Sequence, residues 1–261
     1  MKALGIAASG MLAQQTNVDV IANNIANANT TGFKAGRAAF QDLLYQSDNR
    51  AGALVADDGA IRPVGVDIGL GVATAGIMRL NTQGGMTETG NQLDLAIQGR
   101  GYFQITLPDG TTAYTRAGNF TLSPEGEIVT NDGYPLDPGF AVPEEATSVQ
   151  ISADGVVSVL VPGEMLPQEL GEITLAGFIN EAGLRPMGNN LLAETAASGA
   201  PVLAQAGDEG FGTLRQFYVE ASNVDVIRQI TDLISAQRAY EMNSKAITTA
   251  DQMMQTAVQV R

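Results

Sequence analysis

The side chains of this chain that could perform acid–base chemistry are its carboxylates. Cysteine and histidine are both absent from the 261 residues, as is tryptophan. The chain therefore has no thiolate nucleophile, no disulfide, no sulfur or imidazole metal ligand, and no histidine to act as a general base. Two carboxylates suffice to hydrolyse a glycoside, so a carboxylate-only hydrolase of cell-wall glycan stays open as a function.

Adjacent acidic residues are the first places to look for such a pair. They occur at Asp57–Asp58 and at Glu144–Glu145. Neighbouring side chains on an extended chain point to opposite faces, so neither pair is suited to act on one substrate. We interpret both pairs as solvated loops.

Repeated Asp-Gly turns could in principle supply oxygen ligands to calcium. Neither an EF-hand loop pattern nor a calcium-binding nonapeptide repeat accompanies them. The segment Gly99-Arg100-Gly101 resembles a phosphate-binding loop, but a strand pattern follows it instead of a helix, so we expect a tight bend. We therefore expect no catalytic residue, no cofactor and no metal site.

Charge divides the chain into three parts. Residues 1–45 hold 3 basic and 2 acidic side chains, and residues 211–261 hold five of each. Residues 46–210 hold 6 basic and 21 acidic side chains, a net charge of −15. Neutral ends can pack against copies of themselves, whereas an acidic middle argues against nucleic acid or an anionic membrane as partner.

Both ends carry apolar residues that repeat every seven positions. Near the N-terminus the repeat has Ala7, Ile21 and Ala28 beside it, and near the C-terminus Ile230 lies beside it. The repeated residues are Leu4, Met11, Val18 and Ile25 at one end, and Val226, Leu233, Tyr240, Ile247 and Met254 at the other. Such a repeat needs a partner helix to cover it. A bundle within one chain would satisfy it, but repeats confined to the two ends favour a subunit built to assemble.

The first helix is predicted over residues 3–28, and we read its start as helix and not as a cleaved signal peptide. Four asparagines crowd its end, at positions 23, 24, 27 and 29. They indicate either fraying or amides that bond across a helix interface. Gly32 is placed to cap the helix in a left-handed conformation. No apolar run reaches the roughly 20 residues of a membrane span.

The last helix is predicted to run from a capping box at its start to Arg261. Ser222 is the expected N-cap, with Asp225 three residues further on. No Gly or Pro interrupts the residues that follow. At about 1.5 Å per residue the helix is roughly 55–60 Å long, which is long for a globular domain of this size.

Between the two helices the pattern changes twice. Residues 34–45 favour a short helix or an extended arm, and residues 46–80 favour an extended connector with short strands. From residue 84 alternating stretches are separated by Asp-Gly and Pro-Glu-Gly turns, which predicts β-hairpins. The strands expected are 93–97, 102–107, 111–115, 119–122, 127–130, 149–152, 156–161 and 172–178.

These elements predict an α+β fold. The N- and C-terminal helices pair as a coiled-coil-like hairpin, joined through an extended connector to a mostly antiparallel β-domain. The expected divisions are 1–33 and 216–261 for the two halves of the helical domain, 34–83 for the connector and 84–215 for the outer β-domain.

Three segments resemble one known family in the order in which they occur. Residues 23–34, NNIANANTTGFK, are similar to the N-terminal signature of flagellar rod and hook proteins. Residues 93–101 with Tyr102-Phe103 and Tyr114-Thr115-Arg116 resemble the β-domain motif of the larger subunits. Ser222-Asn223-Val224 with residues 237–245, QRAYEMNSK, resemble the C-terminal signature, and the length together with residues 40–46, FQDLLYQ, is most similar to rod subunits.

The resemblance implies a structural subunit of the distal rod and no enzyme. It would polymerise into a hollow helical drive shaft that transmits torque across the periplasm to the hook, after export by the flagellar type III apparatus. The implied partners are further copies, other rod subunits, hook protein, and the peptidoglycan-ring and outer-membrane-ring proteins, without nucleic acid or membrane insertion. A proximal rod or short hook-like subunit is the alternative. The family's distal rod is stiffened by an insertion that aligns with about 46–66, where this chain differs.

The expected assembly interface combines the heptad residues with side chains of the two terminal signatures. It consists of Leu4, Met11, Val18, Ile21, Asn23, Ile25, Asn27, Val226, Ile230, Leu233, Arg238, Tyr240, Asn243, Ile247 and Met254.

Overall fold

The computed structural model describes residues 2–49, 64–163 and 166–259. Its internal contacts form two compact units. The helical unit comprises Met1–Ala26, Gly36–Met78 and Asp225–Arg261, and the β unit comprises Asn27–Ala35 and Arg79–Val224. The acidic pair Asp57–Asp58 and most of residues 46–66, which align with the stiffening insertion of the family's distal rod, lie outside the described residues.

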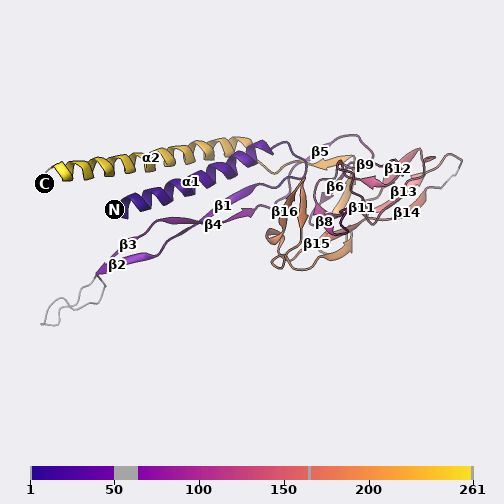
Figure 1. Cartoon of the computed structure of the whole chain (residues 1–261). Helices are drawn as coiled ribbons and strands as arrows, with labels where there is room; N and C mark the ends of the chain where they lie inside the picture. The colour runs from indigo at the N-terminus through magenta and orange to yellow at the C-terminus, as the bar shows by residue number, and fades with distance from the viewer. Residues whose placement is uncertain (1, 50–63, 164–165, 260–261) are drawn as a thin grey trace. The chain divides into compact units, whose positions relative to one another are not determined.

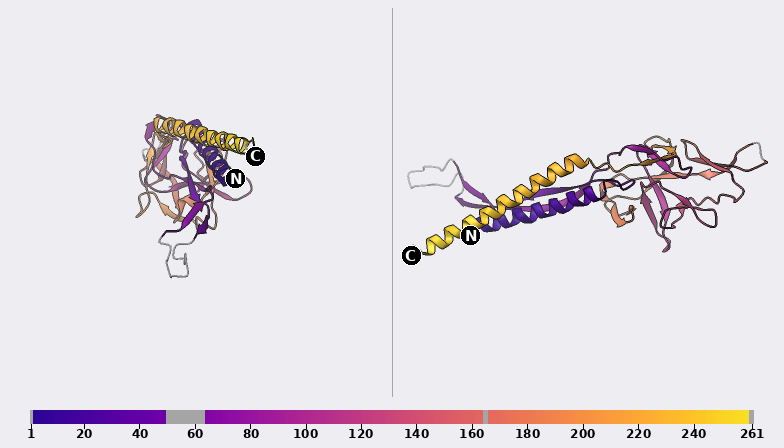
Figure 2. Two further views of the ribbon diagram at one scale, coloured as in Figure 1. Left: turned by 90° about the vertical axis from the view of Figure 1, so that its left-hand side faces the viewer. Right: turned by 90° about the horizontal axis from the view of Figure 1, so that it is seen from above.

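Two long helices form the centre of the helical unit. Helix α1 spans Lys2–Ala26 and helix α2 spans Val226–Gln259. They lie side by side in every view and run in opposite directions (Figures 1 and 2). The predicted α+β fold with paired terminal helices is confirmed. Within the described part of the chain, neither helix is apolar enough over a bilayer-spanning length to cross a membrane.

Two-stranded ribbons complete the helical unit. Strand β1 (Gly36–Asp42) pairs with β4 (Val72–Arg79), and β2 (Tyr45–Asn49) pairs with β3 (Val66–Gly69). The extended alternative for residues 34–45 is therefore the correct one. Strand β1 packs on α1, and the backbone N–H of Val72 donates to the Ser9 hydroxyl over 3.2 Å.

The β unit is built from short antiparallel strands. The largest sheet has seven strands: β16-β17-β8-β7-β15-β18 in order, with β11 paired to β7. Its members are β7 (Tyr102–Thr106), β8 (Thr112–Thr115), β11 (Leu136–Asp137), β15 (Thr174–Gly177), β16 (Arg185–Gly188), β17 (Leu191–Ala193) and β18 (Val202–Gln205).

The other strands of the β unit form smaller sheets. A three-stranded sheet joins β12 (Ser148–Ile151), β13 (Val156–Leu160) and β14 (Gln168–Glu172). Three pairs are β5 (Met86–Glu88) with β20 (Tyr218–Glu220), β6 (Leu95–Gln98) with β19 (Thr213–Gln216), and β9 (Thr121–Leu122) with β10 (Ile128–Val129). One 3₁₀ turn spans Glu181–Gly183.

Alternation along the strands creates two apolar clusters. On β7, Phe103 and Ile105 point into the main core, which the three-stranded sheet shares through Val157 and Val159. Tyr102, on the opposite face, joins a smaller cluster with Tyr114, Phe178 and neighbouring side chains. Alternate residues of β7 are therefore buried on opposite faces of the same sheet, which accounts for the period of two in the sequence.

Two predicted helix ends are wrong in detail. Helix α2 is capped by Asp225, whose Oδ1 accepts from the N–H groups of Ile227 (3.1 Å) and Arg228 (3.2 Å). The Ser222 hydroxyl accepts from Val224 N–H outside the helix. Either residue type can cap, and the one directly before the helical dihedrals holds the position.

Gly32 is also not a helix cap, because α1 ends at Ala26. Its φ of +69° serves the β unit instead. A Cβ atom there would lie 2.6 Å from the backbone nitrogen of Ala117. The close approach of two backbones explains the glycine.

Candidate functional site

Most of the expected interface residues on α1 are half-buried. Ile21 is buried, with 5 % of its surface exposed, and Asn23 is exposed. The others are half-buried: Leu4, Met11, Val18, Ile25 and Asn27. Full burial on α1 belongs to small or flanking side chains, among them Ala7, Ala13 and Val20.

On α2 the expected residues divide into two groups. Leu233, Asn243, Ile247 and Met254 are half-buried, whereas Val226, Ile230, Arg238 and Tyr240 are exposed. Ile230 was expected beside the heptad row, but 46 % of it is exposed. The flanking row that turns towards α1 contains Gln229, Ala236 and Asn243 instead.

Asn24 connects three elements of the helical unit. Its Nδ2 donates to the carbonyl of Gly36 (2.8 Å) and to Oε1 of Gln229 (3.0 Å), and its Oδ1 accepts from Gly36 N–H (2.8 Å). Only 2 % of the residue is exposed. Of the two interpretations of the asparagine cluster, cross-helix bonding therefore holds for Asn24, which was not among the expected interface residues.

Large apolar side chains are exposed on α2 and on the ribbons of the helical unit. On α2, Ile227, Ile230 and Ile234 follow at helical spacing, with exposed fractions of 80 %, 46 % and 46 %. The ribbons add Leu44 and Ile77, exposed by 83 % and 60 %. Three exposed isoleucines on successive turns of one helix form an apolar patch, and such a patch marks an interaction site.

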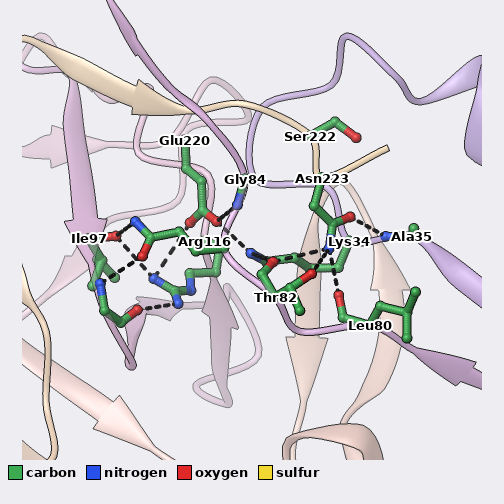
Figure 3. Close-up of polar contacts among 12 residues, drawn as sticks. Lys34, Ala35, Leu80, Thr82, Gly84, Ile97, Arg116, Glu220, Ser222 and Asn223 are labelled. Atoms are coloured by element: carbon green, nitrogen blue, oxygen red, sulfur yellow. Dashed lines mark hydrogen bonds and ion pairs between the residues drawn. The ribbon is translucent and has the colours of Figure 1, made fainter. Parts of the chain in front are cut away.

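The β unit contains a buried ionic cluster formed by Lys34, Arg116 and Glu220 (Figure 3). The carboxylate of Glu220 lies between the two cations and is fully buried. Its Oε1 is 2.5 Å from Lys34 Nζ, and its Oε2 is 3.5 Å from Arg116 Nη1. Burial lowers the pKa of Lys34, and the hydrogen bond and charge of Glu220 oppose that shift.

Backbone carbonyls also accept hydrogen bonds from the two cations. Lys34 also donates to Thr82 O over 2.9 Å. Arg116 donates to Ile97 O (3.3 Å) and to Gly99 O (2.6 Å), and its guanidinium stacks over the Tyr102 ring. These bonds offset part of the cost of burying the charges, although the buried Nε of Arg116 has no hydrogen-bond partner among the described residues.

Asn223 closes the same region from the loop between β20 and α2. Its Oδ1 accepts from Ala35 N–H (2.7 Å), and its Nδ2 donates to Leu80 O (2.8 Å) and Thr82 O (3.0 Å) (Figure 3). One amide thus joins three segments distant in sequence. These cluster residues were missed as functional candidates, although Lys34, Arg116 and Asn223 lie in the motifs that suggested the family.

One pocket of the β unit, of about 250 Å³, holds no pair of carboxylates. Hydroxyl and amide side chains line it together with Ala117 and Leu191, and Asp132 is its one carboxylate. Among the described residues, no three His, Cys, Asp or Glu side chains are grouped to hold a metal ion. The Glu144–Glu145 pair lies on an exposed turn.

Three family models match three separate parts of the chain, one after another along the sequence. Residues 4–34 match the flagella basal body rod protein model, residues 96–159 the flagellar hook protein FlgE/F/G D1 domain, and residues 215–260 the flagellar basal body rod FlgEFG protein C-terminal model. The flagellar basal-body rod protein FlgG of Caulobacter vibrioides is 58 % identical over the full length of both chains. The chain belongs to the flagellar basal-body rod protein family.

Other relatives span nearly the whole chain as well. FlgG of Bacillus subtilis is 42 % identical and covers 97 % of this chain and 96 % of its own. FlgF of C. vibrioides is 34 % identical over 98 % of this chain and 96 % of its own. The ionic cluster takes one residue from each matched segment, Lys34, Arg116 and Glu220, so it joins the parts that define the rod protein family.

Proposed function

We propose that this chain is the structural subunit of the distal flagellar rod. It polymerises into a hollow helical drive shaft that crosses the periplasm and transmits torque to the hook. Membership of the rod protein family supports the placement in the basal body. The observation that carries assembly is the uncovered isoleucine face of α2, which a monomer has no reason to expose.

Electrostatics permit close packing of the helical unit. Residues 211–261 carry equal numbers of basic and acidic side chains, so copies of α2 can approach without net repulsion. The interface expected from sequence, from Leu4 to Met254, forms part of this packing surface. Half-buried heptad residues within the α1–α2 pair become fully covered when neighbouring subunits add to it.

Identity within the family favours the distal rod over the proximal rod. The chain is 58 % identical to FlgG and 34 % identical to FlgF of the same organism. The partners that follow are further copies of this chain, other rod subunits, hook protein and the surrounding ring proteins. The subunit reaches them by type III export and acts without a cofactor or catalytic site.

Electron microscopy of the purified chain at high concentration tests assembly. We expect hollow tubes, and Ile227→Asp combined with Ile234→Asp should prevent them while the β unit stays folded. Ser235→Asp combined with Thr249→Asp, at exposed polar positions outside the isoleucine row of the same helix, is the matched control and should assemble normally. Closed small oligomers from the unaltered chain, or tubes from the double variant, would contradict the proposal.

Genetic replacement tests the choice of rod segment. Expressed in C. vibrioides cells that lack FlgG, the chain should restore motility, whereas cells that lack FlgF should stay non-motile. The reverse result would assign the chain to the proximal rod.

A further inference from the structure

The heptad row of α2 cannot by itself fix how far α2 extends along α1. The row consists of Val226, Leu233, Tyr240, Ile247 and Met254. Sliding α2 by seven residues, about 10.5 Å along the helix, places each apolar side chain where the previous one was. A helix pair held only by this row would have several nearly equivalent registers.

A second row of residues lies beside the heptad row, and its side-chain chemistry does not repeat every seven residues. Read along α2, this second row is Gln229, Ala236, Asn243 and Ala250, so amides and alanines alternate and the chemical pattern repeats every fourteen. Asn24 on α1 bonds Gln229, and Gly10 on α1 lies against Asn243. The two contacts are fourteen residues apart on each helix, which establishes one antiparallel register.

Both amides of the second row meet a matching residue on α1. A Cβ atom on Gly10 would lie 2.9 Å from Nδ2 of Asn243, so glycine makes room for this amide. At the other contact, Asn24 uses both Nδ2 hydrogens, one towards β1 and one towards Gln229. In the same register Ala236, which is 3 % exposed, falls opposite Asn17.

A slip of seven residues removes both matches. Asn24 would then face Ala236, or in the other direction a position before the start of α2 at Val226. One N–H of Asn24 would stay buried without an acceptor, because β1 already holds the other. A buried donor without a partner disfavours the state that contains it.

We propose that Asn24 and Gln229 set the register of the α1–α2 pair, with Gly10 and Asn243 as the second matched contact. They are positioning residues: the apolar row supplies attraction, and the amide row excludes the slipped alternatives. The consequence for a polymer rests on the proposed assembly function, because only a fixed register presents the same outer surface on every subunit. The register itself is a property of one chain.

Engineered disulfides can measure the register, since the chain contains no cysteine. Ala3→Cys with Ala250→Cys reports the observed register, and Ala3→Cys with Ala257→Cys reports a slip of seven without altering either matched contact. Each pair is introduced into the full chain and oxidised, and the intramolecular product is separated on a non-reducing gel. We expect the first disulfide to dominate in the otherwise unaltered chain.

Substitution of Gln229 then tests the cause. Gln229→Leu keeps the bonds of Asn24 to β1 but removes the cross-helix acceptor, so the slipped disulfide should increase by about tenfold relative to the observed-register disulfide. Gln229→Glu keeps an acceptor oxygen and should restore the original ratio. Gln237→Leu makes the same change on the exposed side of α2 and should leave the ratio unchanged.

Several outcomes would overturn the proposal. They are equal yields of both disulfides in the unaltered background, no disulfide from either pair, or a ratio that Gln229→Leu does not change. A loss of both disulfides in Gln229→Leu would show plain destabilisation and would also count against it. Tube formation is scored separately, so failure of assembly with an intact disulfide ratio rejects the proposed function alone.

Discussion

Glu220 holds two cations at a position that water does not reach. Its carboxylate is fully buried between Lys34 and Arg116. Removing the anion leaves both cations buried without their counter-charge, which is far costlier than losing an exposed ion pair. The stability of the β unit should therefore depend strongly on this one residue.

Substitution of this carboxylate is the first test at the residue scale. We expect Glu220→Gln to lower the free energy of unfolding of the full chain by about 3–5 kcal/mol in urea titrations followed by circular dichroism. Glu194→Gln removes an exposed carboxylate and should change it by less than about 0.5 kcal/mol. Equal effects of the two changes would show that the cluster does not stabilise the unit.

Tyr102 predicts an alkaline dependence of stability. Burial, followed by the charge of Glu181, raises the pKa of Tyr102 above its ordinary value of 10.0. Above pH 10 the unfolded chain releases this proton while the folded chain retains it, so stability falls as pH rises. Above pH 10, the free energy of unfolding falls by up to about 1.4 kcal/mol per pH unit while only the unfolded chain has lost this proton.

Tyr102→Phe should flatten this decline in urea titrations between pH 9 and pH 11, the range that brackets the ordinary value. Every other ionisable group is the same in the wild-type and Tyr102→Phe proteins, so the difference between their two stability curves isolates the phenol of Tyr102. Tyr45→Phe, at an exposed position, is the control and should keep the full slope. Parallel curves for the wild-type and Tyr102→Phe proteins would refute the assignment.

The sequence did not reveal these partners because they are far apart along the chain. Lys34 and Glu220 are separated by 186 positions, and each is an ordinary charged residue in its local context. Asn24 was noticed as one of four clustered amides, but only the fold shows which of them is enclosed by β1 and α2. Burial is a three-dimensional property, so spacing alone could not select it.

Elements with local signals were predicted well. The hairpins around Asp109-Gly110 and Asp154-Gly155 are specified by their own turn residues, and strands β7, β8, β12 and β13 lie close to the expected ranges. Strands β19 and β20 were missed. They are short and pair with β6 and β5, more than a hundred residues earlier, so no nearby turn announces them.

The start of α2 gives the prediction at the scale of an element. Asp225→Ala should destabilise the first turn of α2 by about 0.5–2 kcal/mol, because two backbone N–H groups lose their acceptor. Hydrogen exchange should then accelerate at Ile227 and Arg228. Ser222→Ala should leave both rates unchanged, and Asp225→Asn should retain most of the protection. Faster exchange in Ser222→Ala alone would restore the cap predicted from sequence.

At the scale of the whole molecule, charge and apolar exposure are distributed to different parts of the chain. Exposed isoleucines lie on the neutral C-terminal helix, and the net charge of −15 lies in residues 46–210. The sequence predicted this division because charge counts need no structure. Two explanations of the acidity predict different outcomes: solubility alone, or solubility together with free motion of a shaft inside a ring.

A shaft that turns inside a ring must not adhere to it. Under the proposed function, an acidic outer surface stays hydrated and repels an acidic lumen. Glu125, Glu127, Glu144 and Glu145 are all exposed, so their charges can be removed without disturbing packing. Replacing all four by Gln should leave rod assembly intact but slow rotation at low load.

Salt provides the control for this last prediction. Mobile ions screen charges over a Debye length of about 8 Å at physiological ionic strength. If repulsion keeps the shaft free, the difference in rotation speed between wild-type and charge-depleted rods should shrink as salt rises, because screening weakens the repulsion that only the wild-type rod still has. Tethered-bead measurements on motors with either rod provide the speeds. Charge-depleted rods that assemble and spin at wild-type speed in low salt would assign the acidity to solubility alone.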